Sequence, residues 1–310
     1  MKTTEMLPPR IVDDTGVTSL RPISEGAERW LYRPLKCLDH GFVYLVDYMG
    51  NDKAIAQAAG VSYGKGTKKM SEEETLIRYL MRQRHTSPFE MVEFKFHCKM
   101  PIFVARQWIR HRTANVNEYS GRYSEMSEHF YMPDMEQLRI QSSMNKQGRG
   151  EKLTVDQQAR VLEMFSNLYQ MSWDDYQSFL SMDLARELAR IGLSVANYTE
   201  WYWKMDLHNL LHFLRLRLDT HAQYEIRVYA EAIARIVKDA IPIAYRAFEQ
   251  YSLRSLQLME SEIIFIHTHA PMLASPMLEE ELIEKYSVLV PNKREVAEFV
   301  EKMRRLGFVR

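Results

Sequence analysis

The side chains most able to do chemistry are concentrated in one short segment, which runs from Arg106 to Arg122. Its seventeen residues, RQWIRHRTANVNEYSGR, include four arginines, one histidine and one glutamate. An arginine close to a protein core needs an anionic or planar acceptor, and its fork suits the oxygens of phosphate or carboxylate. Ser120, Gly121 and Arg122 add a hydroxyl, an unencumbered backbone NH and a further guanidinium. The segment therefore predicts a site that holds an oxyanion such as phosphate.

A simpler interpretation of a basic cluster is a charged helix end that faces water, which is the commonest outcome for such a run. The neighbouring residues favour the site instead, because apolar side chains flank the cluster on both sides. Ile102, Phe103 and Val104 precede it, Trp108, Ile109 and Tyr119 lie within it, and Tyr123 follows it.

The elements that must position this segment are strands and helices in mixed order. Residues 42–48 are β-branched and aromatic and predict a buried strand. Residues 92–98 alternate between apolar and polar types, as in a strand with one buried face. Residues 51–59 predict a short helix, and Ser71 with Glu74 forms a capping box before a helix that ends near His85. A further helix starts at Pro101, with the RHR triplet at its C-terminal end.

The second half of the chain is richer in predicted helices. We expect helices at 154–182, 183–193, 207–219 and 223–251, a strand at 197–206, and a last helix near 294–306. Strands and helices do not alternate regularly, which indicates an α+β fold. No G-x-G-x-x-G or G-x-x-x-x-G-K-[ST] motif occurs, so a dinucleotide would not be bound in the Rossmann or P-loop manner.

Composition excludes several classes of protein. The 310 residues are 46% apolar and carry 41 basic and 41 acidic side chains, so no excess charge favours nucleic acid or lipid as a partner. Cys37 and Cys98 are far apart and form neither a disulfide framework nor a thiolate metal motif. No signal peptide or apolar run of membrane-spanning length is present, and we expect a cytoplasmic protein.

The segment from Arg110 to Arg122 resembles a known signature, R-H-R-x-x-S-x-N-E-x-S-x-R, of the flavin-dependent thymidylate synthases. Seven residues match it in register: Arg110, His111, Arg112, Asn117, Glu118, Ser120 and Arg122. Asn115 stands where the signature has serine, so the side chain there is an amide in place of a hydroxyl. The similarity extends from about residue 39 to 251 and includes VSYG at 61–64, HTSPFE at 85–90 and RLRLDTHAQYEIR at 215–227.

This resemblance implies a twisted, mainly antiparallel sheet packed with long helices, in a non-Rossmann flavin-binding fold. It implies an N-terminal extension at 1–38, a catalytic domain at 39–254 and a C-terminal extension at 255–310 packed on the core. The implied reaction is reductive methylation of dUMP to dTMP, with 5,10-methylenetetrahydrofolate as carbon donor, FAD as redox carrier and NADPH as reductant. The implied assembly is a homotetramer whose active sites are shared between subunits.

The resemblance also implies the site residues. Those that resemble dUMP contacts are Gln107, Arg110, Glu118, Tyr119, Ser120, Gly121, Arg122, Arg190 and Arg217. Those that resemble FAD contacts are His85, Ser87, Arg110, His111, Arg112, Asn117, Glu118, Asp206, His208, His212 and His221. No metal ligand is implied.

Arg217 is the implied catalytic residue, placed against the uracil ring to favour ionisation of N3. The physics agrees, because a permanently charged guanidinium stabilises an anionic, electron-rich ring. Taken alone, Arg217 could equally pair with Asp219 or stabilise the end of its helix.

Two other classes of protein stay open from the residues alone. His208 and His212 lie four positions apart with His221 nearby, a spacing compatible with zinc in a hydrolase, although the glutamate of H-E-x-x-H is missing. The arginines of 106–122, interleaved with aromatic residues, are also compatible with binding of single-stranded nucleic acid. A yellow protein with flavin absorbance would argue against the zinc hydrolase. Binding of a nucleotide monophosphate that resists moderate salt would argue against the nucleic-acid-binding protein.

Overall fold

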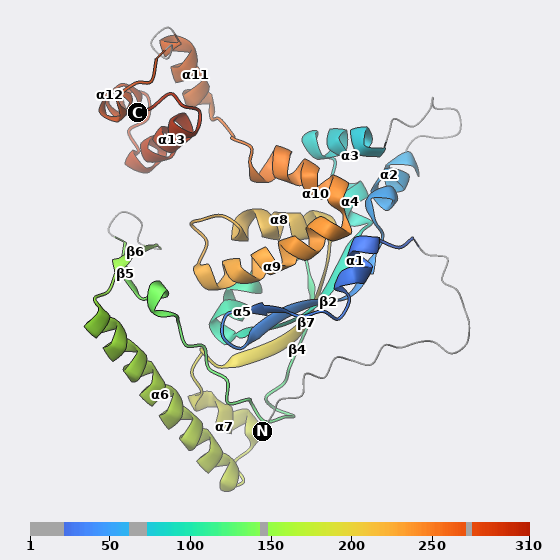
Figure 1. Cartoon of the computed structure of the whole chain (residues 1–310), viewed down its shortest axis with the longest axis vertical. Coiled ribbons are helices and arrows are strands. Elements are labelled where there is room, and N and C mark those ends of the chain that lie inside the picture. The colour runs from blue at the N-terminus through green and yellow to red at the C-terminus, as the bar shows by residue number, and fades with distance from the viewer. Residues whose placement is uncertain (1–21, 62–72, 143–147, 271–274) are drawn as a thin grey trace. The chain divides into compact units, whose positions relative to one another are not determined.

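The computed structural model describes residues 22–61, 73–142, 148–270 and 275–310, and these form two compact units. The first unit ends at Leu253 and the second runs from Arg254 to Arg310 (Figure 1). The candidate site residues all belong to the first unit. The boundary falls next to the predicted start of the C-terminal extension, and the predicted roles of the domains remain expectations.

A five-stranded antiparallel sheet is the centre of the first unit. Its strand order is β1-β2-β3-β7-β4. The strands are β1 (Leu35–Cys37), β2 (Gly41–Met49), β3 (Glu93–Pro101), β7 (Tyr198–Asp206) and β4 (Asn115–Glu118). The expected buried strands at 42–48, 92–98 and 197–206 are therefore present as β2, β3 and β7. The edge strand β4, which lies inside the signature, was not expected.

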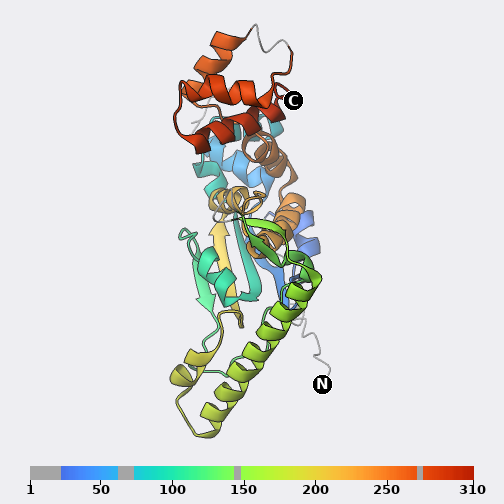
Figure 2. The same cartoon turned by 90° about the vertical axis from the view of Figure 1, so that its left-hand side faces the viewer.

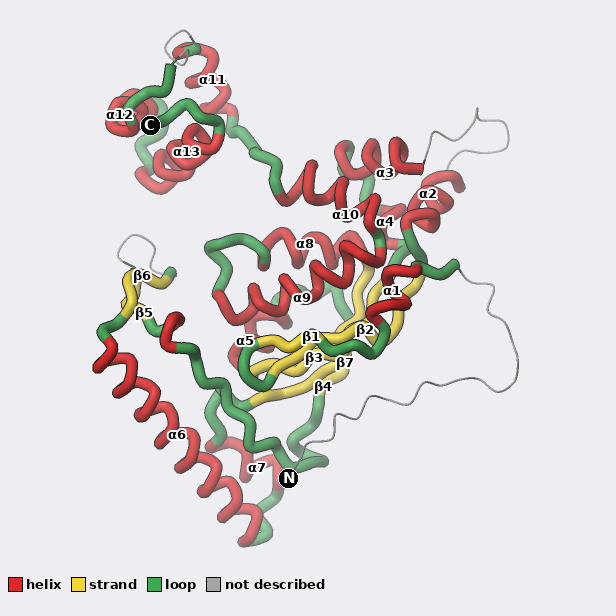
Figure 3. The backbone as a smooth tube through the Cα atoms, viewed as in Figure 1, coloured by secondary structure: helices red, strands yellow, loops and turns green. Residues whose placement is uncertain are grey.

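Helices cover one face of this sheet, as Figure 3 shows. Those around the sheet are α1 (Glu25–Trp30), α2 (Asp52–Val61), α3 (Glu73–Arg82), α4 (Ser87–Glu90), α5 (Ile102–Trp108), α8 (Leu207–Arg217), α9 (Tyr224–Ala240) and α10 (Pro242–Phe248). A π-helical segment, η3 (Glu249–Leu253), follows α10. α5, α8 and α9 all contact the sheet, and α9 contacts both α5 and α8, so the elements that carry the signature and Arg217 share one core.

The core explains why the sheet and helices hold together. Alternate residues of β3 and β7, including Phe96, Trp201 and Trp203, are at most 3% exposed. Trp108 at the end of α5 packs against Trp203 and, in a stacked arrangement, against Phe213 of α8, with ring centroids 5.2 Å apart in both pairs. Buried aromatic side chains contribute large apolar areas. This cluster fixes the ends of α5 and α8 relative to each other.

A helical arm leaves the sheet between β4 and β7. It contains η1 (Met135–Gln137), the hairpin of β5 (Arg139–Gln141) and β6 (Arg149–Lys152), the long helix α6 (Val155–Ser181), α7 (Arg186–Ala189) and η2 (Arg190–Gly192) (Figure 2). Thr154 and Gln157 form a capping box that starts α6. The expected helix at 154–182 is confirmed, but the expected helix at 183–193 is only two short turns. Asp183 there has φ +58°, which is outside helical geometry.

An ion pair attaches the hairpin to α9. Arg149 of β6 donates from Nη2 to both carboxylate oxygens of Glu225, at 2.6 and 2.7 Å. The Tyr131 hydroxyl donates to the same carboxylate at 3.1 Å. Glu225 is 2% exposed, so removal of its partners would leave a buried charge.

Replacement of Glu225 by alanine is expected to lower the free energy of unfolding by about 3 kcal/mol, the low end for a broken buried pair because Arg149 reaches solvent. Urea unfolding of the full chain measures the change. The control is Glu231→Ala, which removes an exposed carboxylate 3.6 Å from Arg227 and is expected to cost less than about 0.5 kcal/mol. Equal losses in the two variants would contradict the stabilising role of the Arg149–Glu225 pair.

One expected helix proved to be two. The predicted helix at 223–251 is broken at Ile241, and α10 starts afresh at Pro242. Proline lacks the amide hydrogen that a helix interior requires, and its ring collides with the preceding turn. Asp52 accepts hydrogen bonds from the amides of Ile243 and Ala244, at 3.0 and 2.8 Å, and so satisfies the new helix start.

The second unit is a small helical cluster. It contains α11 (Glu260–His269), α12 (Glu279–Ser287) and α13 (Lys293–Arg305), which pack around Phe265, Tyr286 and Phe299. Asn292 caps α13 as the sequence indicates. The expected helix near 294–306 is confirmed as α13, whereas α11 and α12 were not predicted. Lys302 donates to Glu262, which is 2% exposed, at 2.6 and 2.7 Å.

Candidate active site

The signature begins where α5 ends. The sequence predicted that the RHR triplet forms the C-terminal end of this helix. In the structure the helix stops at Trp108, so the triplet follows it. β4 then pairs with β7, with Asn117 opposite Tyr202 and Glu118 opposite Trp201. Glu118 accepts a hydrogen bond from the Thr199 hydroxyl at 2.8 Å. The signature is thus held at one end by the aromatic core and in its middle by the sheet edge.

The central contact of the site joins two segments 106 positions apart. Arg217, in the last turn of α8, donates from Nε to Nε2 of His111 at 3.0 Å. A guanidinium nitrogen has no acceptor capacity, so this geometry makes Nε2 of His111 the acceptor and the imidazole neutral. The Phe213 ring packs edge-on against the imidazole with centroids 4.9 Å apart. The predicted catalytic arginine is thus brought directly to the signature.

Electrostatics agrees with a neutral imidazole. Burial, the adjacent Arg217 and then His212 lower the pKa of His111 to about 4. Burial also lowers the pKa of Arg217, which nevertheless remains a cation because arginine starts far above neutral pH. In the neutral range the pair is therefore one cation held by one neutral acceptor.

The pair gives a pH dependence of defined sign. Because the folded pKa of His111 lies below the unfolded value of about 6.5, the unfolded chain takes up this proton first as the pH falls. The stability linked to His111 is complete above about pH 6.5 and is lost as the pH falls toward 4.

We expect a histidine-selective NMR titration to show His111 with a midpoint of about 4. In Arg217→Gln the midpoint should rise but stay below the unfolded value, since burial is the larger cause and persists. Arg215→Gln removes an exposed charge from the same helix and should leave the midpoint unchanged. A wild-type midpoint near 6.5 would show that His111 does not accept from Arg217.

The alternative partner of Arg217 is not used. Asp219 instead pairs with His221, with Oδ1 and Nδ1 2.8 Å apart. Within the part of the chain that the structure describes, the terminal Nη atoms of Arg217 have no hydrogen-bond acceptor. A half-buried guanidinium is thus anchored through Nε and keeps its fork available for a planar or anionic ligand.

A second group of predicted residues gathers at the turn after β4. The Ser120 hydroxyl accepts from the Arg122 amide at 3.3 Å, and Arg122 forms an ion pair with Glu187 at 3.3 Å. Gly121 is buried against Arg190 of η2. A Cβ at Gly121 would lie 2.7 Å from Sδ of Met126 and 3.0 Å from Cδ of Arg190. Arg190, 68 positions downstream of Arg122, therefore packs against this turn.

Unsatisfied polar groups mark the space around these segments. The Gln107 side-chain oxygen is buried and has no hydrogen-bond partner among the described residues. Such atoms are rare in proteins without a ligand or water. Arg110 and Arg112 are exposed, and no carboxylate in the described ranges pairs with either. These donors and acceptors fit a cofactor that carries phosphates and a polar ring, as FAD does.

Of the other predicted residues, His212 adjoins the Arg217–His111 contact, with its ring centroid 6.4 Å from that of His111. The rest lie apart from this contact or have structural roles. Asp206 caps α8 by accepting from the Asn209 amide at 2.9 Å, which accounts for it without a ligand. Ser87 is the first residue of α4, which contacts α8, and His85 lies two residues before it. His208 is partly buried and His212 exposed on α8. Tyr119 uses its hydroxyl as a donor to the backbone of Glu125. No group of three metal-ligating side chains occurs in the described residues.

Two residues that support the site were not identified from the sequence. Thr199 holds Glu118, and Phe213 packs on His111. Thr199 lies in a strand and Phe213 in a helix, and neither spacing signals a contact with the signature. Their roles depend on the strand order and on the angle at which α8 meets the sheet.

Comparison with known proteins gives a consistent answer. The family described as thymidylate synthase complementing protein matches residues 44–243. The chain is 57% identical to a flavin-dependent thymidylate synthase of Ruegeria pomeroyi over 242 residues, 77% of this chain and 80% of that protein. It is 51% identical to one of Dictyostelium discoideum, over 86% of this chain and 90% of that protein. A solved UMP/dUMP methylase of Streptomyces cacaoi, bound with 5-Br UMP, superposes with a TM-score of 0.63 at 33% identity, over 72% of this chain and all of that chain.

The α+β fold, with an edge strand that leads into an arginine-rich turn, offers a site for a phosphorylated ligand. The chain belongs to the family of flavin-dependent thymidylate synthases. The predicted fold class, flavin dependence and methylation of dUMP to dTMP are thereby confirmed. No helix among the described residues is long and apolar enough to cross a bilayer.

Proposed function

We propose that the two groups described above bind opposite ends of dUMP. The turn of Ser120, Gly121 and Arg122, together with Arg190, holds the phosphate, because it offers two guanidinium groups and a hydroxyl beside a residue without a side chain. Arg217 binds the uracil ring. The observation that carries this assignment is the 3.0 Å contact from Arg217 Nε to His111 Nε2, which leaves the rest of the guanidinium free for the ring.

The same segments hold FAD. Arg110, His111, Arg112, Asn117 and Glu118 of the signature do so, with His85, Ser87, His208, His212 and His221. FAD supplies the hydride that a reductive methylation needs. Asp206 retains its predicted place beside FAD, although its carboxylate also caps α8.

Arg217 acts on the electronic state of the pyrimidine. Its cation stabilises the ring ionised at N3, which makes C5 a stronger nucleophile toward the one-carbon unit. His111 is a positioning residue here: it accepts from Nε, so the guanidinium plane is set before substrate arrives. The partly buried setting strengthens the charge interaction relative to water.

Gln107, Glu118 and Tyr119 complete the dUMP site. The orphaned oxygen of Gln107 accepts a hydrogen bond from the nucleotide, which satisfies a group that the chain leaves unpaired. The co-substrates are 5,10-methylenetetrahydrofolate and NADPH. The cytoplasmic location stays a prediction from the sequence.

The enzyme works as a homotetramer, and α6 supplies a subunit interface. A stripe of apolar side chains on this helix is exposed in the single chain, with Met164 62%, Leu168 45% and Met171 59% exposed. The stripe continues at Phe179 and Met182. Contiguous apolar surface of this kind marks an interface.

Leu168→Glu is expected to dissociate the tetramer into smaller species, because an unpaired charge would be buried at the interface. Size-exclusion chromatography with light scattering measures the assembly. The control is Asn167→Glu, which adds the same charge at the exposed position that directly precedes Leu168 in α6. It should leave the assembly intact. A Leu168→Glu protein that remains tetrameric would exclude α6 as the interface.

The direct test of the proposed function is product formation by the purified full chain. With FAD, dUMP, methylenetetrahydrofolate and NADPH, we expect a yellow protein that forms dTMP, detected by chromatography. A colourless protein with stoichiometric zinc and no dTMP would instead support the hydrolase alternative. Salt-sensitive binding of single-stranded nucleic acid without dUMP binding would support the other alternative.

A further inference from the structure

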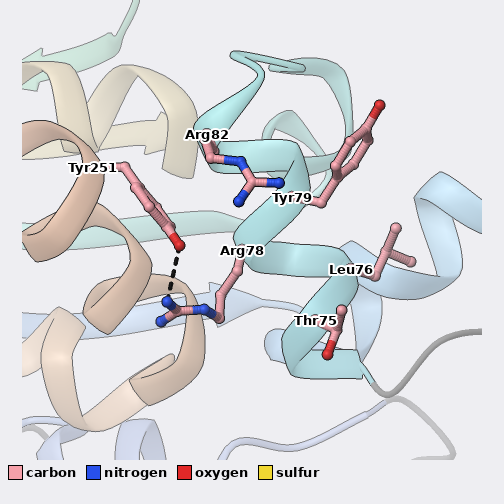
Figure 4. A pocket seen from close by; sticks show the side chains of 6 residues that line it. All are labelled: Thr75, Leu76, Arg78, Tyr79, Arg82 and Tyr251. Atoms are coloured by element: carbon pink, nitrogen blue, oxygen red, sulfur yellow. Dashed lines mark hydrogen bonds between the residues drawn. The ribbon is translucent and has the colours of Figure 1, made fainter.

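A cavity of about 440 Å³ lies between α3 and the π-helical turn that follows α10. Thr75, Leu76, Arg78, Tyr79, Arg82 and Tyr251 line it. Arg78 and Arg82 are four positions apart on α3, which places them on the same side of the helix. Figure 4 shows Arg78 reaching Tyr251, with Arg82 one turn further along α3. None of these residues belongs to the predicted dUMP or FAD site.

The positive charge of this cavity is not balanced by the chain. Arg78 donates to the Tyr251 hydroxyl at 2.8 Å and lies 5.3 Å from the centre of its ring. Arg82 is exposed, and no carboxylate of the described residues pairs with either arginine. Glu74, an acid on the same helix, pairs with Arg246 of α10 at 3.3 Å. Two guanidinium groups therefore face the cavity without an anion.

Tyr251 adds a polarised donor. Its oxygen accepts from Arg78, so its own hydrogen is available to a ligand, and no acceptor for it is found in the described ranges. Tyr251 lies in η3, a π-helical turn. Single π-helical turns occur frequently at functional sites. Two cations, a phenol and the Thr75 hydroxyl suit the oxygens of a carboxylate or phosphate.

The cavity is linked to the proposed flavin site through α3. The Tyr79 ring packs edge-on against His85, with centroids 5.9 Å apart. His85 is one of the residues that we assign to FAD. A molecule that reaches from the flavin along α3 would bring an anionic end to Arg78 and Arg82.

We propose that this cavity binds the anionic end of a co-substrate, through carboxylate or phosphate oxygens. The inference rests on the proposed function, which requires two co-substrates with such ends: the glutamyl carboxylates of the folate and the phosphates of NADPH. The contact is remote from the reacting atoms. It contributes to the binding of the co-substrate and not to the chemical step.

Steady-state kinetics of Arg78→Ala and Arg82→Ala in the full chain test this. We expect the KM of the co-substrate that uses the cavity to rise about tenfold, the scale of one lost charge-assisted hydrogen bond, with kcat and the KM for dUMP unchanged. Tyr251→Phe should give a smaller rise. The control is Arg246→Ala, which removes the same charge from the adjacent helix outside the cavity lining and should change neither KM.

The two sources of the anion are distinguished by the substrates used. A rise with pentaglutamyl but not with monoglutamyl methylenetetrahydrofolate identifies the glutamyl tail, and a rise confined to NADPH identifies the phosphates. Unchanged KM values, or equal rises in Arg246→Ala, would overturn the proposal.

A binding measurement separates this proposal from the proposed function. Calorimetry with triglutamate and with NADP⁺ needs no turnover, so it remains informative if the wild-type chain makes no dTMP. Binding of one of them to the wild type, weakened about tenfold in Arg78→Ala, supports the site. Absence of binding by both, or binding equal in the variant, would overturn it.

Discussion

Arg217→Ala is expected to bind FAD and to lose at least about a thousandfold in kcat for dTMP formation, the scale of removing a preorganised charge from a reacting group. The reason is geometric: the Nη atoms of Arg217 are the free cationic donors beside His111, and alanine leaves none there. Single-turnover assays with FAD-loaded enzyme measure the loss, and flavin absorbance measures the bound cofactor.

The matched control is Arg215→Ala, which removes an exposed arginine from the same helix and should keep near-normal turnover. Arg217→Lys keeps the charge but loses Nε and should recover only part of the activity, since lysine lacks the planar fork. Near-normal turnover of Arg217→Ala would refute its catalytic role, and loss of flavin would show that it mainly holds the cofactor.

Gly121→Ala should raise the KM for dUMP by at least about tenfold with FAD binding retained, because a shifted charge-assisted contact to phosphate is worth this much. An added methyl group would lie 2.7 Å from Sδ of Met126 and 3.0 Å from Cδ of Arg190. Met126 must therefore shift, and Arg190 must give way by a few tenths of an ångström beside the phosphate-binding turn. The dUMP concentration dependence of dTMP formation measures the effect.

Gly192→Ala is the control, since its added methyl group meets no atom within 4 Å although Gly192 lies in the same short helix as Arg190. An unchanged KM for dUMP in Gly121→Ala would place the phosphate elsewhere. Equal effects in both variants would indicate a general disturbance of η2.

The parts of the fold that the sequence predicts are those with a strong local pattern. β3 alternates between apolar and polar residues, and the residues of α6 follow a long helical pattern, so both were predicted from local rules. β4 was missed because its four residues, NVNE, are mostly polar and exposed, and only pairing with β7 makes them a strand. The break before Pro242 was missed because apolar residues continue through it, although proline gives the signal.

The candidate site likewise has a part that the local sequence predicts and a part that depends on tertiary packing. Arg110 to Arg122 is contiguous, so its chemistry can be inferred from residue types, whereas Arg217 needed the family resemblance. The hydrogen bond from Arg217 to His111 could not be predicted from either, because it depends on the packing of Trp108 against Phe213. The cationic cavity at α3 could be recognised only from the structure: Arg78 and Arg82 share a helix face, but Tyr251 is 169 positions beyond Arg82.

A crystal structure of the full chain with FAD and dUMP tests the division of the site most directly. We expect the phosphate against Ser120, Gly121, Arg122 and Arg190, and the uracil ring against the Nη atoms of Arg217, with Nε still donating to His111. A phosphate bound away from this turn, or a uracil ring with no contact to Arg217, would contradict the account.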